Sequence, residues 1–83
     1  MKDGKSYYTP VKPEAVRILA VFLLLEKRQI VNYDRIYLMY EISYNTFMRI
    51  IYSIREVLNN NEVPYKATLI FNRRRNTYEL IKF

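Results

Sequence analysis

The sequence contains no cysteine, no histidine and no tryptophan, and its single glycine is Gly4. Without cysteine and histidine the chain has no disulfide, no thiolate nucleophile, no histidine general acid and none of the common zinc sites. The single glycine, close to the N-terminus, also excludes a glycine-rich phosphate-binding loop. The eight acidic residues are scattered, so they suggest no carboxylate pair for acid–base catalysis. We therefore expect a protein that is not an enzyme and that carries no metal or other cofactor.

Long apolar runs are also missing. The longest one, residues 18–25, is too short to cross a bilayer and lies too far along the chain for a secretory signal. We expect a soluble cytoplasmic protein without a membrane partner. A chain of 83 residues has room for one domain, and its small size makes a monomer only marginally stable.

Acidic residues are too few to balance the basic ones, and the formal net charge is +6. The excess is concentrated in the C-terminal part of the chain, where Lys66, Lys82 and the run Arg73-Arg74-Arg75 are opposed by Glu79 alone. Such a balance favours a polyanionic partner, with nucleic acid ahead of an anionic membrane surface. The alternative is a charge that serves solubility.

The pattern of apolar residues predicts an α+β domain. Helical spacing predicts helices at 13–27, 33–40 and 44–59, with Asn32 and Ser43 as N-caps of the last two. Runs of β-branched and aromatic residues predict strands at 67–71 and 77–81, and the glycine-free segment between them predicts a longer hairpin loop. Three helices followed by a C-terminal hairpin is the order of a winged helix-turn-helix domain. It would span residues 13–83, after an N-terminal tail at 1–12.

The predicted helix at 44–59 is a candidate recognition helix. With Phe47 at the centre of its apolar stripe, the opposite side carries polar and aromatic residues instead of the Glu and Lys of a typical solvated face. Asn pairs with adenine, Arg with guanine or phosphate, Met with a thymine methyl group, and Tyr hydroxyls reach phosphates. Ser43 caps the helix, whose N-terminal N–H groups favour a phosphate. The candidate DNA-binding residues are Ser43, Tyr44, Asn45, Met48, Arg49 and Tyr52.

Three adjacent arginines, Arg73, Arg74 and Arg75, are expected at the tip of the hairpin. Like charges in a row repel one another, and we expect the fold to gain nothing from them. At a hairpin tip they would follow the phosphate backbone or enter the minor groove. The alternative is a solvated loop or a charge-protected sheet edge. Lys2 and Lys5 are weaker candidates for a minor-groove arm.

The predicted helix at 13–27 is apolar on two sides. One side suits the core of the domain, and the second predicts a homodimer interface made by Val16, Ala20, Leu23 and Leu24. The same second side also fits an alternative function, a protein-interaction module such as an anti-repressor or a subunit of a larger complex. RNA binding is less favoured, because the glycine–aromatic sheet motifs that stack bases are absent.

The sequence resembles the N-terminal DNA-binding domain of DeoR-like and WYL-type bacterial transcriptional regulators. The resemblance rests on Arg17-Ile18-Leu19-Ala20, Leu24-Leu25, Ser43-x-x-Thr46-x-x-Arg49-x-Ile51-x-x-Ile54-Arg55 and Arg73-Arg74-Arg75-x-x-Tyr78-x-Leu80. It implies a winged helix that binds operator DNA, with the helix that begins after Ser43 in the major groove. It also implies that Thr46 and Arg49 contact the DNA.

Three positions depart from the family pattern. Glu41 stands where the family has a glycine between its second and third helices, so either the turn is longer or a non-glycine residue adopts a costly backbone. Tyr37 replaces a small residue, and Ile50 replaces an acidic one. No small-molecule effector domain follows the hairpin, so we expect a stand-alone regulator, from a phage or mobile element.

Overall fold

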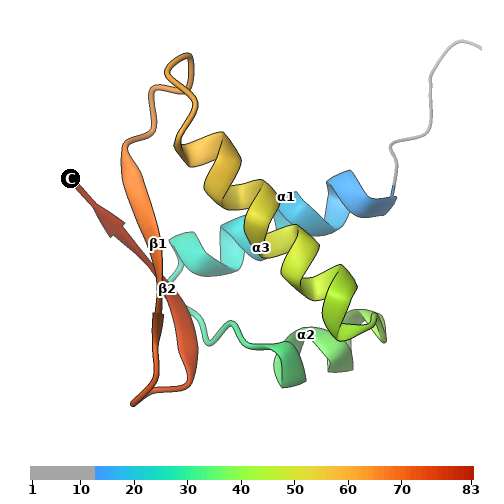
Figure 1. Cartoon of the computed structure of the whole chain (residues 1–83). Helices are drawn as coiled ribbons and strands as arrows, with labels where there is room; N and C mark the ends of the chain where they lie inside the picture. Colours follow the sequence, from blue (N-terminus) through green and yellow to red (C-terminus); the bar gives the residue numbers. More distant parts are fainter. Residues whose placement is uncertain (1–12) are drawn as a thin grey trace, which may run out of the picture.

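The computed structural model describes residues 13–83 and consists of three helices followed by a two-stranded antiparallel hairpin (Figure 1). This α+β order confirms the prediction, and no predicted helix or strand end is off by more than one residue. The predicted tail at 1–12, with Lys2 and Lys5, lies outside the described residues. The elements are α1 (Pro13–Glu26), α2 (Tyr33–Tyr40), α3 (Tyr44–Leu58), β1 (Ala67–Asn72) and β2 (Thr77–Lys82).

Two polar side chains start the second and third helices, as predicted. The side chain of Asn32 accepts a hydrogen bond from the backbone N–H of Arg35 at 2.9 Å, and Ser43 Oγ accepts one from Thr46 N at 3.1 Å. Each bond satisfies a backbone donor that a helix N-terminus otherwise leaves free. Asn32 thereby fixes the start of α2, and Ser43 fixes the start of α3.

The turn between α2 and α3 settles the alternatives raised by Glu41. This residue has φ 54°, in the left-handed region, and its N–H donates to Tyr37 O at 2.7 Å. The turn is therefore short, and a glutamate takes the backbone conformation that glycine adopts more easily. A hydrogen bond from the Tyr33 hydroxyl to Ile42 O, at 2.9 Å, supports the same turn.

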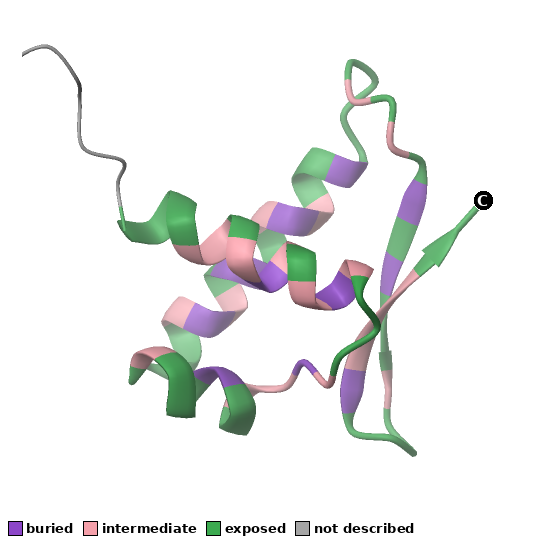
Figure 2. Ribbon diagram, turned by 180° about the vertical axis from the view of Figure 1, so that it is seen from behind, coloured by how far each residue is buried: buried purple, intermediate pink, exposed green. Residues whose placement is uncertain are grey.

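The core is built around α3. Its predicted apolar stripe is buried, and Phe47 at its centre is 1% exposed. Figure 2 shows the buried positions of each element turned toward the interior. The other elements contribute Val21 and Leu25 from α1, Ile36 from α2, Ala67 and Leu69 from β1, and Val31 and Ile42 from the connecting segments.

The hairpin is attached to the helices through the segment before α2. Tyr78 N donates to Val31 O at 2.8 Å, and Val31 N donates to Thr77 Oγ1 at 2.7 Å, so Val31 lies beside the start of β2. Asn32 Nδ2 adds a bond to Asn76 O at 2.8 Å. These bonds hold the start of β2 against the start of α2.

The hairpin loop comprises residues 73–76 and contains no glycine. Asn76 takes the left-handed backbone with φ 53°, which Asn tolerates better than most residues. Asn72 Oδ1 accepts a hydrogen bond from Arg75 N at 3.1 Å and so closes the loop. The prediction of a longer loop in place of a two-residue turn is confirmed.

A charged cluster joins the end of α1 to the hairpin. Glu26 accepts a hydrogen bond from the Tyr65 hydroxyl and lies 3.4 Å from Lys82 Nζ. The bond from Tyr65 is the largest influence that lowers the pKa of Glu26 below its ordinary value of 4.5, and Lys82 adds to it, while burial opposes both. Glu26 therefore favours its charged form in the folded protein.

We expect Glu26 to make the domain acid-sensitive. A carboxyl group whose pKa is lowered by folding stabilises the protein above its unfolded pKa, and this contribution is lost as the pH falls through the folded pKa. Glu26→Gln should therefore show a smaller drop in melting temperature than the parent below about pH 5. Glu56→Gln, at an exposed position on α3, is the control. Parallel acid curves for the parent and both variants would contradict this role.

Candidate nucleic-acid interface

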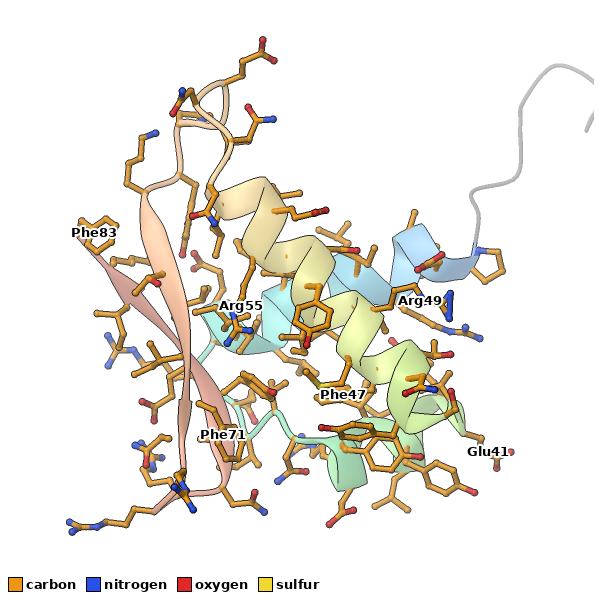
Figure 3. All side chains as sticks on the ribbon, viewed as in Figure 1. Glu41, Phe47, Arg49, Arg55, Phe71 and Phe83 are labelled. Atoms are coloured by element: carbon orange, nitrogen blue, oxygen red, sulfur yellow. The ribbon has the colours of Figure 1, made fainter. Side chains whose placement is uncertain are left out.

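The outward side of α3 carries three exposed side chains near its N-terminal half, Asn45, Arg49 and Tyr52. Each residue of a helix is rotated by about 100° from the one before it, and this rotation places all three on the side opposite Phe47. Tyr52 is 56% exposed, and Tyr44 in the first turn is similarly exposed. In Figure 3, Arg49 extends from the side of α3 away from the hairpin. The helix thus presents an amide, a guanidinium group and two phenols to the surroundings.

Three other candidate contact residues of α3 are engaged in the fold. Met48 is half-buried against the core, and its Sδ accepts a hydrogen bond from the Tyr78 hydroxyl at 3.7 Å. Its predicted place beside the outward residues therefore needs correction, because it faces the hairpin. Ser43 Oγ donates to Thr46 Oγ1 at 3.0 Å while it caps the helix. Ser43 therefore serves the fold as a helix cap, and the Thr46 hydroxyl already has a hydrogen-bond partner within the protein.

The arginine run lies in the loop at the tip of the hairpin, and all three side chains are exposed. Arg75 is paired with Glu79, with 3.3 Å between its Nη1 and Glu79 Oε2, and Glu79 also accepts from Asn72 Nδ2 at 3.3 Å. Arg75 thus has an acidic partner in the hairpin, which the sequence reasoning did not anticipate. Arg73 and Arg74 remain as the main source of positive charge at the tip.

The hairpin tip and the N-terminal end of α3 lie at the same end of the molecule. In Figures 1 and 2 both are close to the level of α2, whereas the loop that follows α3 lies at the opposite end. The bond from Asn32 to Asn76 ties the loop directly to the start of α2. The hairpin tip is consequently fixed against the start of α2, at the same end of the molecule as the first turn of α3.

Arg55 connects α3 to the hairpin, a role that the sequence reasoning missed. Its Nε and Nη2 both donate to Leu69 O at 3.4 Å, and its Cζ lies 6.0 Å from the centre of the Tyr78 ring. Figure 3 shows Arg55 between α3 and the hairpin. Helical spacing could have indicated this role. Arg55 lies one turn after Tyr52 and two turns after Met48, on the side of α3 that faces the strands. The guanidinium group of Arg55 therefore places a positive charge between α3 and the hairpin.

Aromatic rings continue this surface toward the tip. Phe71 on β1 is 41% exposed and packs on Tyr78 with 4.9 Å between ring centres. Burial is the main cause that raises the pKa of Tyr78. Arg55 opposes the shift, and the nearby phenols of Tyr44 and Tyr52 add to it. Phe71 is a second residue that the sequence reasoning missed.

The predicted dimer residues lie on two sides of α1. Val16 and Leu23 are exposed, Ala20 is half-buried, and Leu24 is half-buried because it packs against the core. Leu19, which was not among the predicted residues, is 58% exposed. The exposed apolar side of α1 thus consists of Val16, Leu19 and Leu23, with Ala20 at its edge.

No family model, no curated protein and no solved structure matches this chain. The resemblance to DeoR-like and WYL-type regulators therefore stays a prediction that rests on the residues quoted for it. None of the helices in residues 13–83 has both the length and the apolar composition that a bilayer-spanning segment needs.

Proposed function

We propose that the chain is a winged helix-turn-helix protein that binds double-stranded DNA as a transcriptional regulator. One observation carries the proposal: the N-terminal half of α3 and the arginine tip lie at the same end of the molecule, and Arg55 binds the hairpin to α3 through Leu69 O. A duplex that meets one of them is within reach of the other. The net charge of +6 supports a polyanionic partner.

In this mode of binding, the N-terminal half of α3 enters the major groove. Asn45 is placed to pair with a base edge, and Arg49 with a base or a phosphate. Tyr44 and Tyr52 have exposed rings whose hydroxyls suit phosphate oxygens. Arg73 and Arg74 at the hairpin tip would follow the neighbouring backbone or minor groove, where they supply sequence-independent affinity.

Asn45→Ala should change sequence preference and leave general DNA affinity nearly intact. A base contact of this type contributes about 1–3 kcal/mol of discrimination, whereas affinity for random duplex comes from phosphate contacts. Selection of bound sequences from a random duplex pool, followed by anisotropy titrations, measures both quantities. The control is Asn61→Ala, an exposed asparagine in the loop at the other end of the molecule. If Asn45→Ala selects the same sequences as the parent and binds them equally well, the assigned contact is wrong.

We further propose that the regulator is a homodimer through the exposed apolar side of α1. A domain of this size gains stability from such an association, and Val16, Leu19 and Leu23 follow a helical spacing that suits a helix pair. The operator would then be an inverted repeat with half-site centres about 10 bp apart or a multiple.

Leu19→Glu should convert the dimer to a monomer, because it places a charge inside the interface. Sedimentation of the parent and the variant at tens of micromolar, on the order of a weak dimer constant, measures this change. Leu38→Glu, at an exposed leucine of α2, is the matched control. A parent that sediments as a monomer, or a Leu19→Glu variant that stays dimeric, would contradict the interface.

The same exposed side of α1 also favours a second candidate function, a protein-interaction module without direct DNA contact. The two functions differ in a simple measurement. A DNA-binding protein is retained on heparin and binds random duplex at low salt, with an affinity that falls steeply as salt is added. Absence of binding at about 50 mM salt would favour the interaction module.

A further inference from the structure

We propose that the surface between α3 and the hairpin also binds single-stranded DNA, by stacking unpaired bases on exposed aromatic rings. The stacking surface is defined by Tyr44, Tyr52 and Arg55 of α3 and by Phe71 and Tyr78 of the hairpin. This activity goes beyond duplex binding and does not depend on it, because a duplex hides the faces of its bases and a single strand exposes them.

The rings of the stacking surface are supported from below. Phe47 is buried, and its ring centre lies 6.4 Å from that of Tyr44 and 6.0 Å from that of Tyr78. Phe71 packs on the other side of Tyr78 at 4.9 Å. Buried Phe47 therefore links Tyr44, in the first turn of α3, to Tyr78 and Phe71 of the hairpin from the inside. Because these rings are fixed before binding, a base that stacks on them costs little ordering of the protein.

Phe71 packs on Tyr78 on one side, and much of the rest of its ring is left exposed. Ala67 and Leu69, which share its side of β1, are buried, but Phe71 lies beyond the core next to the arginine loop and is 41% exposed. Figure 3 shows its side chain between the hairpin and α3. An apolar ring in water next to a basic loop is a suitable partner for a nucleobase.

The charges around the rings fit a phosphate chain. Arg55 lies within 6.0 Å of the Tyr78 ring centre, and Arg73 and Arg74 are exposed beyond Phe71. Glu79, the acidic residue of β2, is neutralised by Arg75 at 3.3 Å. Aromatic platforms beside basic side chains are the usual means by which proteins bind single strands, because every base has a face that can stack. The basic rim makes an uncharged peptide a poorer match.

The test compares two labelled probes with the same number of phosphates. One is an oligothymidine of about 12 nucleotides, and the other is an abasic chain of equal length, so that their difference in affinity measures the bases alone. In anisotropy titrations we expect the parent to prefer oligothymidine by at least about 25-fold, because the stacking of one base on Phe71 and of another on Tyr52 contributes about fivefold each. Equal affinity for the two probes would overturn the proposal, because binding would then be purely electrostatic.

Two variants and one control locate the effect. Phe71→Ala and Tyr52→Ala should each reduce the preference for oligothymidine by roughly fivefold or more and leave abasic binding unchanged. Tyr52 is exposed, so we expect Tyr52→Ala to stay folded. It keeps the test valid if Phe71→Ala unfolds because it loses the contact with Tyr78. Phe83→Ala is the control, because Phe83 is 88% exposed at the opposite end of the hairpin (Figure 3). If Tyr52→Ala and a folded Phe71→Ala keep the parent's preference, the stacking surface is wrong. Asn45→Ala should keep it, which separates this proposal from duplex recognition.

Discussion

Replacement of both Arg73 and Arg74 with alanine is expected to lower the affinity for random duplex DNA by roughly 60-fold at 0.1 M salt. Each neutralised phosphate contributes about 0.9 to the slope of log K against log salt. Between 1 M and 0.1 M salt, each such contact therefore raises the binding constant by about 0.9 log unit. The slope itself should flatten by about 2, one unit for each arginine. Anisotropy titrations of a labelled random duplex at four salt concentrations, about 50 to 200 mM, measure both quantities.

A charge-matched control separates a phosphate contact at the tip from a general effect of charge. Lys27→Ala with Lys66→Ala removes the same two charges from exposed positions away from the hairpin tip. This control should retain most of the parent's salt slope. Arg75→Ala should have a smaller effect than either tip arginine, because Arg75 already pairs with Glu79. An equal loss of affinity and slope in the control and in the tip variant would show that the tip has no special role.

Phe47→Ala is expected to have the largest effect on stability, about 3–5 kcal/mol. Phe47 is 1% exposed and its ring packs against Tyr33, Tyr44 and Tyr78, so its removal leaves a cavity where α2, α3 and the hairpin meet. Small domains are stabilised by only about 5–15 kcal/mol in total, so the variant should be close to unfolding. Urea unfolding followed by circular dichroism gives the change in free energy of unfolding.

The comparison for Phe47→Ala comes from the other side of the same helix. Tyr52→Ala removes an aromatic ring of similar size that is 56% exposed, and surface changes of this kind usually stay within about 0.5 kcal/mol. Similar losses of stability for the two variants would contradict the orientation of α3, on which the exposure of Asn45 and Arg49 depends.

Local signals explain why the helices and caps of this domain are predictable. Asn32 and Ser43 act within a few residues of themselves, and the stripe around Phe47 follows from helical spacing alone. The conformation of Glu41 was less accessible. The sequence left open a longer turn or a left-handed glutamate. The left-handed conformation is unfavourable for a non-glycine residue, and only the packing around the turn decides whether it is adopted.

The errors in the candidate site come from contacts between elements. Met48 lies at the border of the outward side of α3. Whether its side chain faces solvent depends on which side of the helix the hairpin packs against. The pairing of Arg75 with Glu79 depends on the hairpin register, in which Asn72 lies opposite Thr77. Phe71 has the inward alternation of a core residue, but its position along β1 places it past the end of the core. The surroundings of Met48 and Phe71 depend on residues far along the chain, whereas Arg75 and Glu79 are only four residues apart but meet because the hairpin forms.

In the proposed mode of binding, α3 and the hairpin tip contact one duplex at the same time. The absence of cysteine allows a single reactive site to be placed at will, so Asn45→Cys and Arg74→Cys can each carry a DNA-cleaving iron chelate. On a duplex selected for tight binding, we expect Asn45→Cys to direct cleavage to one major groove. Arg74→Cys should direct it to the adjacent minor groove, within about half a helical turn, or 5 bp. Cleavage from one position only, or cleavage at unrelated sites, would contradict the account.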